Sequence, residues 1–73
     1  MKHKFIAWVR GSSIAVGNTV ENCLRNAQRE LDLCEWYGDP PHILRLTTYG
    51  QQRFVGDYSL KAGKLESWDT KHR

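Results

Sequence analysis

Residues 19–34 read TVENCLRNAQRELDLC, and the spacing of their apolar side chains decides the fold prediction. These side chains recur every three or four residues, which places them on one stripe of an α-helix. Asn18 with Glu21 three residues later is typical of a helix start, and Gly38 followed by two prolines is typical of a helix end. We therefore expect a helix that begins at Thr19. Its buried stripe would comprise Val20, Cys23, Leu24, Ala27, Leu31 and Cys34.

Two apolar side chains lie off this stripe. If the helix runs as far as Trp36, then Leu33 and Trp36 are either exposed or covered by the loop that follows. Cys23 and Cys34 would lie roughly 16 Å apart along the helix, which is beyond the reach of a disulfide bond. We expect both to be buried free thiols.

Before the helix, KFIAWVR (residues 4–10) and SIAV (residues 13–16) flank Gly11-Ser12 and predict a β-hairpin. A two-residue Gly11-Ser12 loop pairs Val9 with Ile14 and Ala7 with Val16. Residues directly opposite each other share a face, so one face is apolar and faces the core. The core face would carry Phe5, Ala7, Val9, Ile14 and Val16, and the other face Lys4, Ile6, Trp8, Arg10, Ser13 and Ala15.

After the helix, ILRLTT (residues 43–48) and QRFVGDYSL (residues 52–60) predict a second hairpin. A loop with an odd number of residues pairs Leu46 with Phe54 and keeps the apolar side chains on one face, with Arg45 and Asp57 as diagonal neighbours. A further turn closes Leu65 against Leu60 in a short fifth strand. The core face would carry Leu44, Leu46, Phe54, Tyr58 and Leu60.

These elements predict a single α+β domain over residues 1–73, with frayed ends at about 1–3 and 70–73. The order is β-β-α-β-β with a fifth short strand, and one amphipathic helix packs on one face of an antiparallel sheet. The chain has 73 residues, 40% of them hydrophobic and 26% charged, which argues against a disordered polar chain. The longest apolar run, residues 5–9, is too short to span a membrane, and the start lacks the pattern of a secretory signal, so we expect a cytoplasmic protein.

Charge is distributed unevenly along the chain. Positive residues prevail in 1–10 and 43–73, whereas negative residues prevail in 11–42, so the strands are basic and the helix is acidic. The net charge of the whole chain is +3. We expect the sheet face away from the helix to carry cationic and aromatic side chains together. The candidate binding residues are Trp8, Arg10, Arg45, Arg53, Lys64 and Trp68.

Cations interleaved with aromatic residues are typical of nucleic-acid binding, because Lys and Arg neutralise phosphates while bases stack on indole rings. The first hypothesis is therefore a small basic module that contacts nucleic acid or a nucleoprotein through the open sheet face. Trp and Arg also anchor protein interfaces, so the alternative is a protein-binding module or inhibitor, such as a small phage-type antagonist of a host complex. A domain of this kind could also form a homodimer through an edge strand.

Catalytic chemistry has little support in the sequence. The serines have no histidine in a context typical of a catalytic dyad, and no phosphate-binding or dinucleotide-binding motif occurs. His3, His42 and His72 are dispersed, and none has metal-ligand spacing to a cysteine or another histidine. We expect no enzyme activity, no cofactor and no metal.

Overall fold

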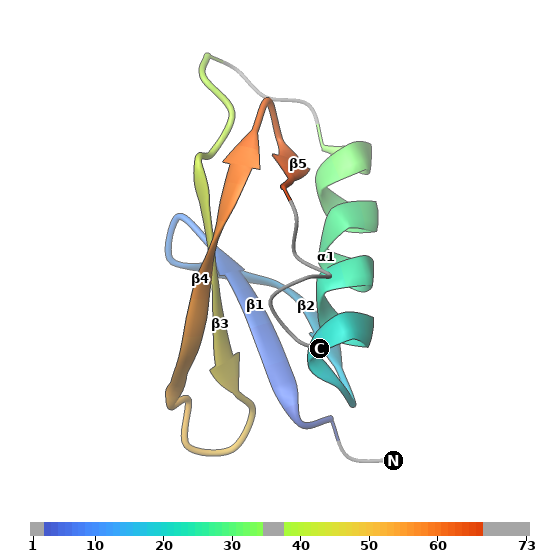
Figure 1. Cartoon of the computed structure of the whole chain (residues 1–73), viewed down its shortest axis with the longest axis vertical. Coiled ribbons are helices and arrows are strands. Elements are labelled where there is room, and N and C mark those ends of the chain that lie inside the picture. Colours follow the sequence, from blue (N-terminus) through green and yellow to red (C-terminus); the bar gives the residue numbers. More distant parts are fainter. Residues whose placement is uncertain (1–2, 35–37, 67–73) are drawn as a thin grey trace.

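The computed structural model describes residues 3–34 and 38–66. These residues form β1 (Phe5–Val9), β2 (Ser12–Gly17), α1 (Val20–Leu33), β3 (Ile43–Thr48), β4 (Phe54–Lys61) and β5 (Lys64–Leu65). All neighbouring strands are antiparallel, and the sheet has the order β2-β1-β3-β4-β5. The sheet is curled, and α1 packs on one side of it (Figure 1). The predicted α+β fold is confirmed.

The helix α1 is close to the one that the apolar spacing predicts. Its N-cap is Thr19, one residue later than expected, and the Thr19 side chain accepts a hydrogen bond from the Asn22 amide at 3.0 Å. The helix ends at Leu33, and Cys34 is already extended. Cys34 is therefore exposed, which corrects the prediction that it lies on the buried stripe, whereas both cysteines are free as predicted. Leu33 is exposed, and Trp36 lies outside the described residues.

The core lies between α1 and one face of the sheet. At Gly17 the end of β2 lies close to α1, because a Cβ atom there would come within 2.5 Å of the Cys23 backbone nitrogen. The end of β2 can lie this near to α1 only because residue 17 has no side chain. The buried core residues are Ala7, Val9, Cys23, Leu24, Ala27, Leu31, Leu44, Leu46, Tyr58 and Leu60.

The first hairpin differs from its predicted register. The turn is Arg10-Gly11, and both residues have positive φ values, +53° and +80°. This pattern is typical of a type I′ turn, whose twist matches that of the flanking strands. Val9 consequently pairs with Ser12, and Ile14 is an extra residue at a β-bulge, so the predicted partners of Val9 and Ala7 are wrong. Ala15 lies opposite Ala7 and packs against the core, in the place predicted for Val16.

The second hairpin has the predicted alternation but not the predicted partners. Leu46 pairs with Gly56, two residues from the expected Phe54, so Leu44, Leu46, Tyr58 and Leu60 still face the core. A bulge at Val55 then places Phe54 opposite Thr47. Phe54 is 63% exposed, which corrects its assignment to the core. Arg45 and Asp57 are directly opposed and not diagonal.

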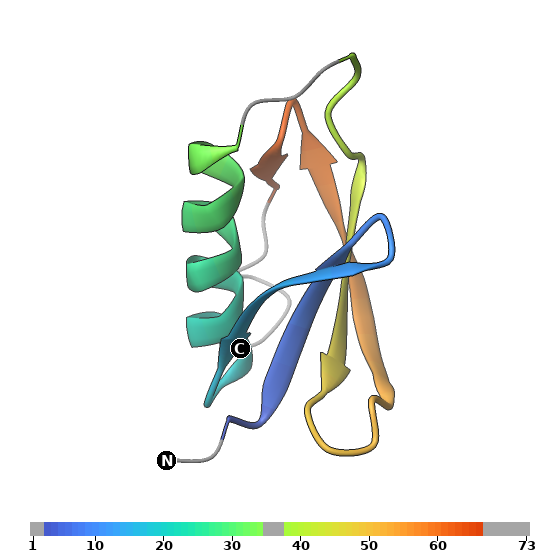
Figure 2. The same ribbon diagram turned by 180° about the vertical axis from the view of Figure 1, so that it is seen from behind.

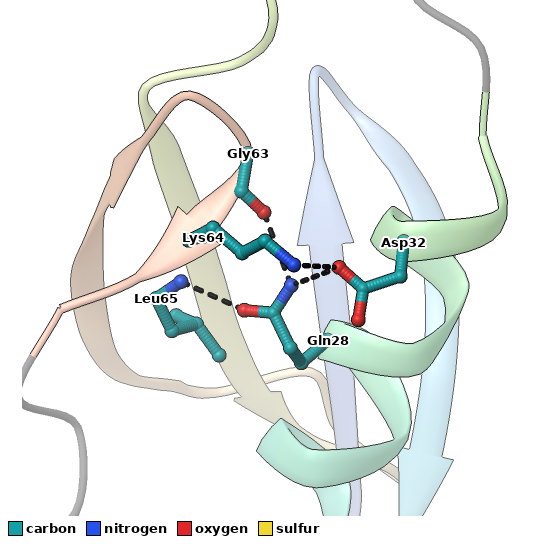
Figure 3. A network of polar contacts seen from close by, with 5 residues as sticks. All are labelled: Gln28, Asp32, Gly63, Lys64 and Leu65. Carbon is teal, nitrogen blue, oxygen red and sulfur yellow. Dashed lines mark hydrogen bonds and ion pairs between the residues drawn. The ribbon is translucent and has the colours of Figure 1, made fainter.

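Strand β5 pairs with β4, with Leu65 opposite Leu60 as predicted, and a polar network attaches it to α1 (Figure 3). The Gln28 side chain accepts a hydrogen bond from the Leu65 amide at 2.7 Å and donates to the Gly63 carbonyl at 3.2 Å. It also donates to Asp32, which accepts from Lys64 Nζ at 2.7 Å. These bonds hold the edge of the sheet against the helix.

Candidate binding face

The face of the sheet that α1 leaves uncovered, called the open face here, carries the side chains that alternate with the core residues. Successive side chains of a strand point to opposite sides, and directly opposed residues on neighbouring strands share a side. The open face is therefore built of cross-strand rows. One row is Ile6, Thr47 and Phe54, the next is Trp8, Arg45 and Asp57, and the third contains Ile43 and Ser59.

The Trp8 side chain reaches from β1 to β3 on this face. Its indole Nε1 donates a hydrogen bond to the Thr47 hydroxyl at 2.8 Å, and Thr47 itself is buried. The only polar atom of the indole thus has an acceptor within the protein. The half-buried ring is held in place and leaves an apolar surface for contact.

Arg45 lies in the middle of the open face and is bound on two sides. Its Nε and Nη2 atoms donate to the two carboxylate oxygens of Asp57 at 3.0 and 3.3 Å. Its guanidinium carbon lies 5.3 Å from the centre of the Phe54 ring, within the range of a cation–π contact. The hydrogen bond with Asp57 raises the pKa of Arg45 above its ordinary value. Arg45 is therefore a fixed cation whose charge is matched by an adjacent carboxylate.

A hollow of about 580 Å³ lies over β1 and β3 on this side of the molecule. Its size is within the range of roughly 300–1,000 Å³ that is common for ligand sites. Its apolar lining comes from Trp8, Pro41 and Ile43, and its charged or titratable lining from Arg10, Arg45 and His42. Gly11, Thr47 and Gln52 complete it.

One end of the hollow is formed where the β1–β2 turn meets the segment that leads into β3. The turn lies on the side of the sheet away from α1 (Figures 1 and 2). Its positive-φ geometry lets the Arg10 side chain donate a hydrogen bond to the Asp39 backbone carbonyl. This bond joins the turn to residues 38–42, two of which line the hollow.

The structure brings together three of the six predicted binding residues, because Trp8, Arg10 and Arg45 all line the hollow. Arg53 is exposed in the connection between β3 and β4, outside the lining. Lys64 binds Asp32 on α1, so its ammonium group lies toward the helix and not over the open face. Trp68 lies outside the described residues.

Sequence reasoning missed several residues of the site. Phe54 was placed in the core because the alternation does not reveal the bulge at Val55. Pro41 and His42 come directly before β3, and a proline next to a strand indicates a rigid approach to it, but not which face it covers. Gln52 approaches the site through a turn in which its φ is +54°.

The described residues offer binding surfaces more readily than reactive groups. Cys23 is buried, and this burial raises the pKa of its thiol to about 11. Burial likewise raises the pKa of Tyr58, with a smaller contribution from Cys23. Both side chains belong to the core on the opposite side of the sheet. Over residues 3–34 and 38–66, no cluster of three or more His, Cys, Asp or Glu side chains could hold a metal ion.

Comparison with models of known protein families, with curated proteins and with solved structures finds no match to this chain. Within the described part of the chain, α1 is neither long nor apolar enough to cross a membrane.

Proposed function

We propose that this protein is a non-enzymatic module that binds a partner protein through its open face. The observation that carries the proposal is the hollow beside Trp8, next to large apolar side chains that the fold leaves uncovered. Ile43 is 57% exposed and Phe54 is 63% exposed, and both lie on the open face. A patch of this kind, combined with Trp and Arg, is typical of protein-recognition surfaces.

The charges of the open face favour a protein over nucleic acid. Nucleic-acid binding draws its affinity from several cations that neutralise phosphates and release counterions. The charge of Arg45 is matched by Asp57, and Lys64 is paired with Asp32 beside the helix. Of the four cations predicted for this face, only Arg10 and Arg45 line the hollow.

The exposed aliphatic side chain of Ile43 points the same way. Base stacking requires flat aromatic surfaces, whereas Ile43 presents a rounded aliphatic surface that packs well against protein side chains. The Trp8 indole lines the same hollow, and its N–H group is already bonded to the Thr47 hydroxyl. Tryptophan is among the residues most enriched at the centres of protein interfaces.

The proposal is tested by capture from a nuclease-treated lysate followed by mass spectrometry, with the wild-type protein and two matched variants. Ile43→Ser removes an apolar group from the open face, whereas Leu33→Ser removes an even more exposed one from the end of α1. We expect Ile43→Ser to lose a specific partner that Leu33→Ser retains. Circular dichroism should show that both variants fold, because both positions are exposed.

A parallel titration with labelled single-stranded and duplex oligonucleotides tests the alternative, which is nucleic-acid binding. Asp57→Asn removes the carboxylate that matches Arg45 and should strengthen binding if phosphates are the ligand. Micromolar binding at about 50 mM salt that weakens steeply with added salt and strengthens in Asp57→Asn would overturn the proposal in favour of nucleic acid. Equal capture by Ile43→Ser and wild type would also overturn it.

A further inference from the structure

The two edges of the sheet differ in how well they are protected against a further strand. With the order β2-β1-β3-β4-β5, the edge strands are β2 and β5. Strand β5 has only two residues, one of them Lys64, and is bonded to Gln28 and Asp32 of α1. Short length, an edge lysine and contact with a helix are common means by which proteins keep an edge strand from pairing. The β5 edge is therefore poorly suited to a partner strand.

The β2 edge has none of these protections in its sequence. Its six residues, SSIAVG, include no charged residue and no proline. Among the described residues β2 pairs only with β1, so the backbone N–H and C=O groups on its outer side are not paired with another strand. An edge of this kind is a template for a further antiparallel strand.

A groove of about 230 Å³ lies beside this edge, between β2 and α1. Its lining comes half from the strand and half from the helix, and comprises Ile14, Ala15, Val16, Asn26, Arg29 and Glu30. The three strand residues are half-buried, so they offer apolar surface to an occupant. The Asn26 side chain donates a hydrogen bond to the Val16 carbonyl at 2.9 Å, which fixes the helix beside the strand. A carbonyl can accept two hydrogen bonds, so this contact is compatible with a second donor.

Arg29 and Glu30 place a positive and a negative charge side by side at this groove. Both residues are exposed, and neither forms an ion pair within residues 3–34 and 38–66. Such a pair complements itself when a second copy is turned by 180°, because Arg29 of each copy then approaches Glu30 of the other. The two charges cancel, so they favour neither a strongly acidic nor a strongly basic partner.

We infer that the occupant of the β2 edge is a second copy of this chain. The two β2 strands pair in antiparallel fashion about a two-fold axis, and Arg29 of each copy binds Glu30 of the other. The pairing consumes the β2 edge of both copies and leaves only the β5 edges, so assembly stops at the dimer.

The two-fold axis runs through the β2–β2 contact, perpendicular to the joined sheet. Both helices therefore lie on one side of the joined sheet and both open faces on the other. The dimer thus leaves the hollow of each copy uncovered, and the inference does not depend on the proposed function.

Sedimentation equilibrium of the wild-type protein over about 10–500 µM tests the association. One strand and one side of a helix from each copy form a small interface, so we expect a weak dimer whose fraction rises with concentration. A protein that remains monomeric over this range overturns the inference. So does one that forms assemblies larger than a dimer, because β2 pairing closes on itself.

Charge reversal tests the helix contact. Arg29→Glu and Glu30→Arg each bring like charges together twice in the dimer, and each should weaken it about tenfold or more. The double variant restores opposite charges and should regain most of the affinity. Arg53→Glu is the control, because it changes the net charge as Arg29→Glu does but lies in the exposed connection between β3 and β4. Circular dichroism should show that all four variants fold, since the substituted residues are exposed.

Ser13→Lys tests the strand contact, because a lysine on an edge strand opposes pairing. Ser13 is exposed, so the fold should persist while the dimer weakens about tenfold or more. Ser59→Lys is the matched control, because Ser59 is an exposed serine on β4, which has a neighbouring strand on each side. We expect Ser59→Lys to dimerise as the wild type does.

Two results would show that a dimer forms through another surface, and either would overturn the inference. The first is a wild-type dimer that tolerates Ser13→Lys and both single charge reversals. The second is a dimer that is lost in Ile43→Ser, because Ile43 lies on the open face and not at the β2 edge. A charge reversal that weakens the dimer no more than Arg53→Glu does would likewise contradict the contact between Arg29 and Glu30.

Discussion

The indole of Trp8 and the hydroxyl of Thr47 are joined by a 2.8 Å hydrogen bond that links β1 to β3 across the open face. The two residues lie in adjacent cross-strand rows, since Trp8 is opposite Arg45 and Thr47 is opposite Ile6. The bond therefore sets the direction in which the ring lies over the sheet. The position of the proposed binding surface depends on this contact.

Thr47→Val tests this contact, because valine has nearly the same shape but cannot accept the hydrogen bond. We expect a loss of about 0.5–1.5 kcal/mol in the free energy of unfolding, since the half-exposed indole N–H can turn to water. Urea denaturation followed by circular dichroism measures the loss. Ser59→Ala, on the same face but exposed, should change stability by less than about 0.5 kcal/mol. Equal stability of Thr47→Val and wild type would mean that the bond contributes nothing.

Gly17→Ala should strongly destabilise the protein. Its Cβ atom would lie 2.5 Å from the Cys23 nitrogen and 2.7 Å from the Cys23 Cα, so β2 and α1 would have to move apart. We expect a loss of about 1–3 kcal/mol, measured by thermal or urea denaturation. Gly50→Ala is the control, because a Cβ there meets no atom within 4 Å. A neutral Gly17→Ala variant would contradict the close packing of β2 on α1.

The attachment of β5 to α1 should weaken in acid. The hydrogen bond from Lys64 holds the pKa of Asp32 below its ordinary value, and Gln28 adds a smaller contribution in the same direction. A carboxyl group whose pKa is lower in the folded chain stabilises the fold above its unfolded pKa, and this stabilisation disappears as the pH falls through the folded pKa.

We therefore expect Asp32→Asn to be less stable than wild type at about pH 7, with the difference shrinking at about pH 2. Urea denaturation at both pH values provides the comparison. The pair is exposed to solvent, so added salt should also reduce the difference. A difference that is the same at both pH values would show that the charge of Asp32 has no role.

The two thiols should differ in reactivity. Cys34 is exposed after the end of α1, whereas Cys23 is buried with a pKa raised to about 11. Iodoacetamide at about pH 8 should label only Cys34 in the folded protein, because alkylation requires an accessible thiolate. Peptide mass spectrometry would identify the labelled cysteine, and both should react in denaturant. Rapid labelling of Cys23 without denaturant would contradict its place in the core.

A related expectation concerns alkaline pH. A thiol whose pKa is higher in the folded than in the unfolded chain stabilises the fold fully below its unfolded pKa and loses this effect as the pH rises through the folded value. For Cys23 this window runs from its ordinary value of 9.0 to about 11. Stability should fall across this range, by roughly 2–3 kcal/mol from this group. Cys23→Ala should show a smaller decline, relative to its own stability at about pH 8.

The helix and its buried stripe follow from the sequence alone. The positions of Cys23, Leu24, Ala27 and Leu31 on one side of α1 depend only on the helical repeat, which is a local property of the backbone. The end of the helix was less well predicted. Cys34 fits the repeat, but the chain becomes extended there before Gly38 is reached.

The alternation of apolar and polar residues also predicted most of the core residues in β3 and β4. Leu44, Leu46, Tyr58 and Leu60 face α1 although the predicted partner of Leu46 was wrong. A shift by two residues keeps every side chain on its face, whereas a shift by one reverses them. The parity of the strands was therefore within reach of sequence reasoning, but the exact partners were not.

The sequence by itself determined the helix and the alternating strands, because these depend on residue type and local spacing. The tertiary structure alone decided which side chains form the proposed binding surface. Strand order places Trp8 beside Arg45, the bulge at Val55 turns Phe54 outward, and the Lys64 side chain reaches Asp32 on the helix. These arrangements depend on contacts between segments that are far apart in the chain. A local pattern of residues does not show which of these segments come into contact.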